Sequence, residues 1–283
     1  MIVTDSEKTI SALCSDWRAE GLSVGLVPTM GALHRGHLSL VKTAVASVDR
    51  VVVSIFVNPT QFAAGEDLDR YPRTLQQDCE QVKKAGACAV FTPDTVTVYP
   101  EGFSSEVRVS GITEGLCGAY RPGHFDGVST VCAVLFGIVK PEVAVFGMKD
   151  AQQLAVIRRM VSDLRMGVDI VAAPIVREAD GLAMSSRNRY LSVEERGQAV
   201  LINTGLEKAV SLCRGGEKNC AVLKEAFLQT VSNASKLRVQ YAEIVDPDTL
   251  LQVETAEKTV LLAVAVFAGK TRLIDNVLIR PEV

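Results

Sequence analysis

The sequence predicts an α/β chain in which a doubly wound parallel sheet is followed by a second, smaller α+β domain. Several short runs in the first two thirds are apolar at successive positions, which is typical of strands buried on both faces of a parallel sheet. Segments with helical spacing of apolar residues separate these runs, as in βαβ crossovers. The predicted parallel strands are residues 22–27, 50–57, 87–91, 143–146 and 168–173.

The crossover helices are predicted from apolar spacing and from one capping pattern. The first helix is indicated by Leu38, Val41, Val45 and Val48, which recur at helical intervals. Thr74 and Gln77 indicate a capping box at the start of the second, before apolar positions at Leu75, Val82 and Ala85. Further helical patterns span 125–139 and 150–165, and the sheet ends near residue 176.

The remainder of the chain predicts the α+β domain, so the predicted division is 1–176 and 177–283. This part begins with a polar loop that contains a glycine, READGLAMSSRNRYLS. Helical patterns follow at 193–213 and 219–231, and strand-like runs at 238–246, 259–267 and 271–279.

The overall charge and the N-terminus exclude several classes of protein. The formal net charge of −3 and a pI near 5.7 give no basic field for nucleic acid or an anionic membrane. The N-terminus lacks the basic start and apolar core of a signal peptide, and no apolar run approaches the roughly 20 residues of a membrane span. We therefore expect a cytoplasmic protein that binds neither nucleic acid nor membrane.

The cysteines indicate neither a disulfide framework nor a zinc ribbon. They are odd in number and never spaced as C-x-x-C. We expect small buried side chains, no bound zinc and no role in the chemistry for Cys14, Cys79, Cys88, Cys117, Cys132, Cys213 and Cys220.

The segment VPTMGALHRGH, residues 27–37, holds two of the three histidines. It follows the first predicted strand, and open parallel sheets bind ligands at the carboxyl ends of their strands. The N–H groups and dipole of a helix that begins near Gly36 favour an anion, and His34 and His37 can donate to phosphate oxygens as negative charge develops. A zinc pair is the first alternative, although such pairs on helices are four residues apart. The second alternative is that the two side chains only open a helix.

Six segments, in chain order, carry a resemblance to a known family. The H-x-G-H pattern resembles the nucleotidyltransferase superfamily, which includes class I aminoacyl-tRNA synthetases. The wider set is similar to the pantothenate synthetase (pantoate–β-alanine ligase) family: VPTMGALHRGH, VVVSIFVNPTQF, RYPRTLQQD, RPGHFDGVSTV, KDAQQLAVIRRMV and READGLAMSSRNRYLS.

The resemblance implies an activity and an architecture. It implies an ATP-dependent ligase that joins pantoate to β-alanine through a pantoyl adenylate, releasing pyrophosphate and AMP. The first domain would be a Rossmann-like nucleotidyltransferase fold that binds ATP and pantoate, and the second a smaller lid. A homodimer, and Mg²⁺ carried with the ATP phosphates, are also implied.

The resemblance also implies a set of site residues. The catalytic residues would be His34, His37, Lys149, Ser185 and Arg187. ATP contacts are implied for Met30, Gly31, Ala32, Leu33, His34, Arg35, Gly36, His37, Gly147, Met148, Lys149, Asp150, Val176, Met184, Ser185, Ser186 and Arg187. Gln61 and Gln153 would hold pantoate, and Gln61 would also help to receive β-alanine.

The residue chemistry agrees with these roles and leaves plainer alternatives. Asn58 and Gln61 stand just past a buried strand, where amides can bind a small polar acid, whereas a surface turn is the alternative for Gln61. Lys149 at a helix start suits phosphate, but it also suits a solvated helix face. The stretch MSSRN, residues 184–188, offers hydroxyls and the planar fork of Arg187, or is an exposed linker.

Some features depart from the family pattern or stay open. Met148 and Cys117 each stand where the family usually has a glutamate. Protein contacts to Mg²⁺ are therefore open, with Asp78 or Asp150 as candidates through water. His124 is either a group on the substrate side or an N-terminal helix cap. The alternative functions are an enzyme that adenylates a different small acid, and an ATP-binding relative without turnover.

Overall fold

The computed structural model describes residues 1–62, 66 and 68–281, which form two compact units. The first unit contains Met1–Ser110, Arg121–Met148 and Val156–Pro174. The second contains Gly111–Tyr120, Lys149–Ala155 and the described chain from Ile175 onward. The domain boundary after residue 176 stays a prediction. Among the described helices, none is both long and apolar enough to cross a membrane.

The first unit is built on a parallel sheet with the strand order β1-β4-β3-β2-β5-β6 in the described chain. β2 pairs with β3 on one side and with β5 on the other, so the winding reverses at β2. The carboxyl ends of β2 and β5 border this switch point, where open parallel sheets bind ligands. The strands are β1 (Ile2–Thr4), β2 (Val24–Thr29), β3 (Arg50–Ile55), β4 (Ala89–Phe91), β5 (Val143–Gly147) and β6 (Asp169–Ala173).

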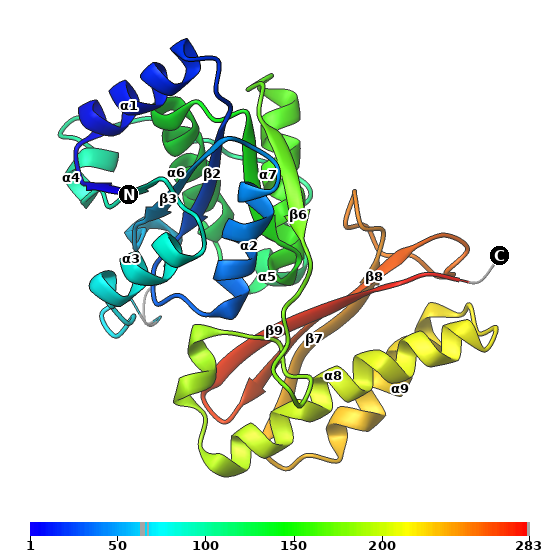
Figure 1. Ribbon diagram of the computed structural model, residues 1–283. Coiled ribbons are helices and arrows are strands. Elements are labelled where there is room, and N and C mark those ends of the chain that lie inside the picture. The colour runs from blue at the N-terminus through cyan, green and yellow to red at the C-terminus, as the bar shows by residue number, and fades with distance from the viewer. Residues whose placement is uncertain (63–65, 67, 282–283) are drawn as a thin grey trace. The chain divides into compact units, whose positions relative to one another are not determined.

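Helices cover both faces of this sheet (Figure 1). Apolar residues of α2 and α3 pack in one cluster with Val145 of β5. The next residue, Phe146, points to the opposite face because side chains alternate along a strand, and its ring contacts Phe136 of α6. The helices are α1 (Glu7–Ala19), α2 (Arg35–Val45), α3 (Leu75–Lys84), α4 (Thr95–Val98), α6 (His124–Val139) and α7 (Ala151–Asp163), whose first turns belong to the second unit.

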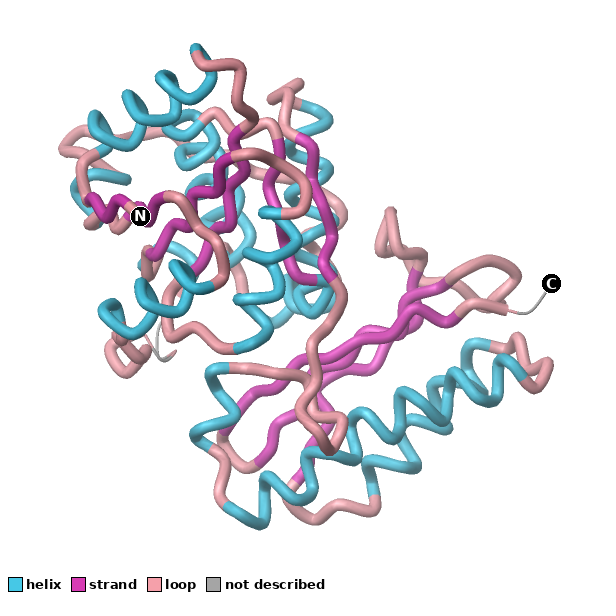
Figure 2. Tube along the Cα trace, in the orientation of Figure 1, coloured by secondary structure: helices cyan, strands magenta, loops and turns pink. Residues whose placement is uncertain are grey.

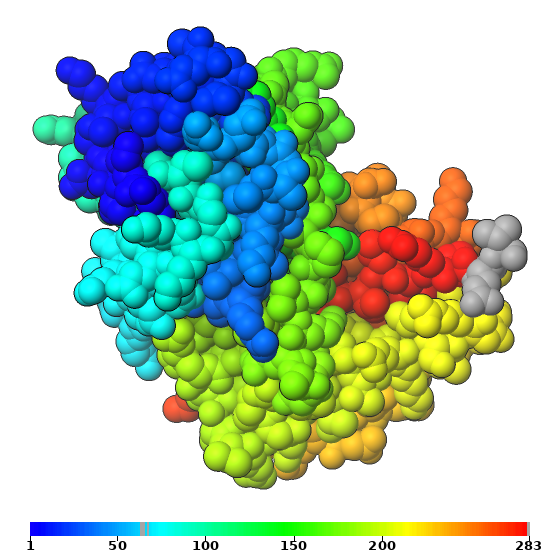
Figure 3. All heavy atoms as spheres, in the orientation of Figure 1, coloured from blue at the N-terminus to red at the C-terminus, as the bar shows by residue number. Residues whose placement is uncertain are grey.

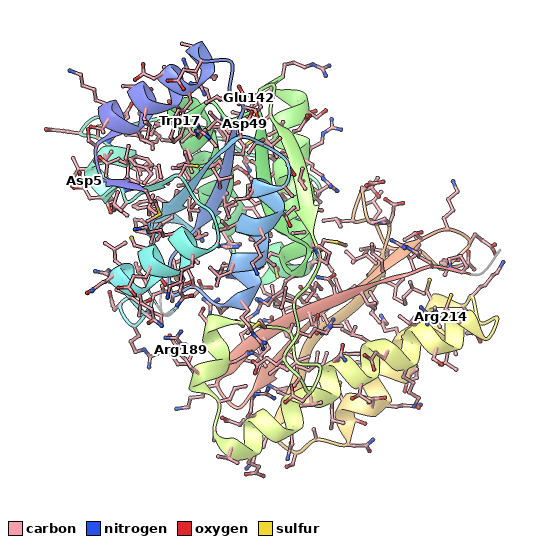
Figure 4. The ribbon with its side chains drawn as sticks, in the orientation of Figure 1. Asp5, Trp17, Asp49, Glu142, Arg189 and Arg214 are labelled. Atoms are coloured by element: carbon pink, nitrogen blue, oxygen red, sulfur yellow. The ribbon has the colours of Figure 1, made fainter. Side chains whose placement is uncertain are left out.

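Two carboxylates hold the amino end of β2, opposite to the switch point. Asp49 Oδ2 accepts from the backbone N–H of Ser23 at 2.9 Å, and Glu142 Oε2 accepts from that of Val24 at 2.7 Å. Figure 4 labels both acids beside the start of the strand. The Ser23 hydroxyl and N–H lower the pKa of Asp49, so this carboxylate stays ionised. Asp49 and Glu142 thus satisfy backbone N–H groups at the start of β2.

The second unit is an antiparallel sheet, β7-β8-β9, packed against two helices (Figure 2). Apolar residues of the strands and helices form one buried cluster. In the space-filling view α8 and α9, in shades of yellow, lie at the surface of this unit (Figure 3). The elements are α5 (Leu116–Tyr120), the 3₁₀ helix η3 (Ser186–Tyr190), α8 (Val193–Arg214), α9 (Cys220–Ser232), β7 (Leu237–Val245), β8 (Val260–Ala268) and β9 (Thr271–Ile279).

The predicted fold class is confirmed, with one local correction and several additions. The capping box at Thr74 is wrong, because its hydroxyl donates to Asp78 Oδ2 at 3.1 Å instead of capping α3. The elements β1, α1, α4 and α5 were not predicted. Five cysteines are buried as expected, whereas Cys79 and Cys88 are half-buried, and none of the seven is in a disulfide.

Candidate active site

His34 and His37 cap the start of α2 with their own rings. His34 is the N-cap residue, and its Nδ1 accepts from the backbone N–H of Gly36 at 3.1 Å. His37 Nδ1 accepts in turn from the backbone N–H of His34 at 3.3 Å, and the ring centroids are 4.0 Å apart. The two side chains therefore open the helix, and they do so through Nδ1 of each ring.

These hydrogen bonds determine which nitrogen of each ring carries the proton. A neutral imidazole whose Nδ1 accepts a hydrogen bond carries its proton on Nε2. His34 and His37 therefore each have Nε2–H as their donor, the tautomer that suits an anion. The backbone N–H groups of His34 and Gly36 already donate to the rings. An anion here would consequently be bound through the rings rather than through these two amides.

A buried carboxylate shapes the loop before His34. Asp78, in the first turn of α3, is 1% exposed, and it accepts from the backbone N–H groups of Ala32 and Leu33, each at 2.9 Å. The loop is tight, with φ of 81° at Gly31 and 50° at Ala32. A Cβ at Gly31 would lie 3.2 Å from Asp78 Oδ2, so glycine gives the carboxylate its space. Asp78 thereby fixes the backbone that leads into the histidines.

Asn58 and Gln61 lie at the end of β3 and are both buried. Asn58 Nδ2 donates to Gln61 Oε1 at 3.2 Å and to the Gly127 carbonyl at 3.1 Å. Gln61 Nε2 contacts Met30 Sδ at 3.0 Å, so a residue that follows β2 touches one that follows β3. Gln61 is only 9% exposed within the 3₁₀ helix η1 (Pro59–Gln61), which makes the surface-turn alternative wrong.

Gly127 allows α6 to approach η1 closely. A Cβ at this position would lie 2.6 Å from the Thr60 carbonyl carbon and 2.8 Å from Gln61 N. Both neighbours are backbone atoms, so they cannot move aside as a flexible side chain would. Residue 127 must therefore be glycine for Gln61 to take this position.

His124 holds the backbone of Gln61 rather than capping a helix. Gly123 is the N-cap of α6, so the helix-cap alternative for His124 is wrong. His124 Nδ1 is 2.8 Å from the Gln61 carbonyl oxygen, and Nε2 is 2.9 Å from Arg121 Nη1. The carbonyl only accepts and the guanidinium only donates, so His124 is neutral with its proton on Nδ1. Arg121 also forms a bidentate ion pair with Glu66, from Nε to Oε1 at 2.7 Å and from Nη2 to Oε2 at 2.6 Å.

In the second unit, Lys149 and Ser185 line one small cavity. Lys149 follows β5 in the 3₁₀ helix η2 (Met148–Asp150) and is half-buried, which does not fit a solvated helix face. The cavity, of about 10 Å³, has room for about one water molecule. It is lined by Lys149, Leu182, Ala183, Ser185, Asn188, Ile202, Leu273, Ile274 and Asp275.

The MSSRN stretch is held by several contacts, so the exposed-linker alternative is wrong. Ser185 Oγ accepts from the Arg187 N–H at 3.2 Å and caps η3, and Ser186 is buried. Asn188 Nδ2 donates to Glu178 Oε1 at 2.8 Å. One strand-like bridge, Arg177 with Ala183, closes the base of the loop.

Val176 and Met184 are joined to each other in the second unit. The Met184 N–H donates to the Val176 carbonyl at 2.9 Å. A backbone contact of Val176 with ATP would therefore have to share this carbonyl or use the N–H group. The two predicted ATP contacts thus form one short piece of structure.

Gln152 is a buried neighbour of Gln153 that the sequence did not single out. It is 6% exposed, and its Nε2 donates to the carbonyls of Ile112 and Gly115 at 2.9 and 2.8 Å. Its Oε1 accepts from the Cys117 N–H at 2.9 Å. Gln152 therefore holds the loop before α5, while the half-buried Gln153 stays the predicted pantoate residue.

The Cys117 side chain contacts polar groups rather than apolar ones. Its Sγ is 3.1 Å from the Tyr241 hydroxyl and 3.3 Å from Arg272 Nη2. Burial, with Cys117 as a further cause, raises the pKa of Tyr241 well above its usual range, so the phenol stays neutral. A thiol here accepts or donates weakly without adding charge beside Arg272.

The described residues offer Mg²⁺ few protein ligands. Asp78 does not fit, because three donors occupy its carboxylate and almost none of it is exposed. Asp150 is half-buried in η2 and stays a candidate. Within the described ranges no three His, Cys, Asp or Glu side chains converge as a metal site would require.

Comparisons with known proteins identify the family of the chain. The family model for pantoate-beta-alanine ligase matches residues 2–278. This chain belongs to that family. It is 49% identical over 276 residues to pantothenate synthetase of Clostridium novyi, covering 98% of each chain. It is 50% identical over 279 residues to the enzyme of Heliobacterium modesticaldum, covering 99% of each.

Solved structures give the same result. Pantothenate synthetase from Thermus thermophilus is 42% identical, with a TM-score of 0.93, over 99% of this chain and 100% of that one. Pantoate-beta-alanine ligase from Francisella tularensis, complexed with beta-gamma ATP and beta-alanine, is 33% identical, with a TM-score of 0.80. That match covers 98% of this chain and 97% of the other.

The predicted site residues fall into two groups, one in each unit. The first unit holds the segment from Met30 to His37, Asn58, Gln61, Gly147 and Met148. The second holds Lys149, Asp150, Gln153, Val176 and Met184 to Arg187. Within each unit, hydrogen bonds or a shared cavity bring several of these residues together.

Proposed function

We propose that this chain condenses pantoate with β-alanine at the expense of ATP, through a pantoyl adenylate. Family membership along residues 2–278 supports the overall reaction. The observation that carries the proposal is the His34–His37 cap at the carboxyl end of β2, with Nε2–H the donor of each ring. These donors suit an α-phosphate whose charge grows as it is attacked.

Activation of the acid comes first in this proposal. A carboxylate oxygen is a poor leaving group, whereas the same oxygen leaves readily as part of AMP. Gln61 and Gln153 would align the pantoate carboxylate for in-line attack on the α-phosphate. Pyrophosphate leaves in that step, and β-alanine then attacks the acyl carbon and releases AMP.

Lys149 and the Ser185–Arg187 stretch would bind the departing phosphates. Lys149 supplies a compact charge, and Arg187 a planar fork that matches two phosphate oxygens. Their shared structural setting, in which Lys149 and Ser185 line one cavity, supports this assignment. Water would take the proton of the β-alanine ammonium, because Nδ1 of His37 already accepts a backbone hydrogen bond and its Nε2 carries the proton.

Mg²⁺ would be bound mainly by the ATP phosphates, where it would offset their negative charge. Asp150 is the described carboxylate in the predicted site that could reach such an ion through water. A homodimer and a cytoplasmic location complete the proposal and rest on the family resemblance. Light scattering after gel filtration tests the first of these.

Isotope exchange tests the order of the chemistry. Labelled pyrophosphate should exchange into ATP when pantoate is present and β-alanine is absent, because the adenylate forms reversibly. Omitting pantoate should abolish the exchange. A requirement for β-alanine would contradict a separate adenylate, and exchange without pantoate would indicate a nucleotidylated enzyme. Replacing pantoate with other small hydroxy acids tests the specificity for the acid.

A further inference from the structure

Two successive residues of β9, Asp275 and Asn276, are buried polar groups without a role in the proposal above. Each is 3% exposed. Asp275 stands between Leu273 and Val277, which pack in the apolar cluster of the second unit. A charge at such a place is costly unless it is paired, so its partners indicate why it is there.

Asp275 holds the base of the loop that carries Ser185–Arg187. Its oxygens accept from Arg177 Nη1 at 2.6 Å and from Nη2 at 3.0 Å. Arg177 Nη1 also donates to the Gly181 carbonyl at 3.0 Å. Burial raises the pKa of Asp275, and hydrogen bonds from Arg177 together with the charge of Lys149 oppose that rise. The pair therefore ties one turn of the loop to β9.

Asn276 holds the other predicted phosphate-binding segment. Its Nδ2 donates to the backbone carbonyl of Lys149 at 2.9 Å. Asp275 and the Lys149 side chain both line the small cavity that Ser185 also lines. Two neighbouring residues of one strand thus attach to Lys149 and to Arg177, which are 28 residues apart in the sequence.

We infer that Asp275 and Asn276 are positioning residues that set Lys149 and the Ser185–Arg187 stretch in register to bind the phosphates of ATP. Neither residue needs to touch the nucleotide. The inference rests on the proposed function, since it takes both segments as phosphate ligands. It predicts that β9 controls ATP affinity while leaving the affinity for β-alanine unchanged.

The sharpest test replaces the ion pair with apolar residues of similar size. A buried ion pair exchanged in this way often leaves stability unchanged or increased. In the full chain, Arg177→Met with Asp275→Leu should therefore keep the thermal midpoint yet raise the Kd for ATP at least about tenfold. Calorimetric titration with ATP measures this without turnover, and steady-state kinetics should show an unchanged KM for β-alanine.

A second variant keeps the inference testable if the double variant fails to fold. Asn276→Asp has nearly the same shape but sets a carboxylate against the Lys149 carbonyl. It should therefore also raise the Kd for ATP at least about tenfold. The matched control is Lys224→Gln with Glu243→Gln, a partly exposed ion pair of the same unit. We expect the control to keep the wild-type Kd.

The outcomes separate the inference from the proposed function. A folded double variant, or a folded Asn276→Asp variant, with a Kd for ATP within twofold of wild type would overturn the inference. An equal loss in the control pair would also overturn it. A wild-type protein that binds ATP but forms no AMP with pantoate and β-alanine would overturn the proposed function alone.

Discussion

Asp78 in the first unit and Asp275 in the second are both buried carboxylates, but their partners differ. Asp78 accepts from two backbone N–H groups and a hydroxyl. Asp275 accepts from a guanidinium and from one backbone N–H. Each lies next to a predicted phosphate ligand. Asp78 holds the residue before His34, and Asp275 lines the same small cavity as Lys149.

The difference shows two ways to prepare an anion site. Backbone donors let Asp78 fix the shape of one short loop. A guanidinium lets Asp275 join two distant segments, since Arg177 can reach from one to the other. The first arrangement should therefore be sensitive to loss of acceptor capacity, and the second to loss of the pair.

The largest expected effect comes from the ligands themselves. His37→Ala and Lys149→Ala should each lower kcat by about 100-fold or more, because each removes a donor to charge that develops along the reaction. Pyrophosphate exchange and thermal unfolding of each variant are the measurements. Folded variants with near-normal rates would show that the two carboxylates stand behind no catalytic group.

Asp78→Asn should produce a smaller effect on both stability and rate. The amide keeps the size but turns an NH₂ group toward one of the loop donors, which should cost about 1–3 kcal/mol of unfolding free energy. We expect kcat to fall about tenfold with the misplaced loop, measured beside urea unfolding. Thr74→Val is the matched control, because it removes one donor and keeps the acceptor. An equal fall in kcat for Thr74→Val would contradict the assignment.

The smallest effect concerns buried thiols, whose pKa values are shifted mainly by burial rather than by hydrogen bonds. Burial raises the pKa of Cys132 to about 12 and that of Cys14 to about 11. Both should therefore react with iodoacetamide at pH 8 more slowly than the half-buried Cys88, as peptide mass spectrometry can measure.

The sign of the pH effect on stability follows from the same shifts. Below about pH 8 the thiols are protonated in both the folded and the unfolded state, so the unfolding free energy does not depend on pH through them. It should fall from about pH 9, as unfolded thiols ionise, toward the folded value of about 12 for Cys132. A stability that rises over this range would contradict the burial of these groups.

Much of the fold could be predicted because its strands are buried on both faces. The run at 50–57 is apolar without alternation, and the structure has β3 there. β1 has three residues, and Ile2 and Val3 are about half-exposed at a sheet edge, so no periodicity marks it. α1 buries only Ile10 and Cys14, although Ser6 is a cap signal that could have indicated its start.

The site was predictable where the chemistry is local in the chain. The spacing of His34 and His37 is enough for reciprocal capping, and it indicated a helix start correctly. For Asp78 the sequence suggests only a metal contact, because the loop residues that donate to its carboxylate precede it by some 45 residues. The link between Asn276 and Lys149 spans 127 residues, and no local pattern can reveal it.

The second unit is assembled from three separate stretches, which has a consequence for biosynthesis. Gly111–Tyr120 and Lys149–Ala155 leave the ribosome well before the strands with which they belong. The loop held by Asp78 can close early, because both of its parts precede residue 80. Lys149 must wait for Asn276, near the end of translation, for its hydrogen bond. A nascent chain would therefore acquire its histidine donors first and its second set of phosphate ligands only when synthesis is almost complete.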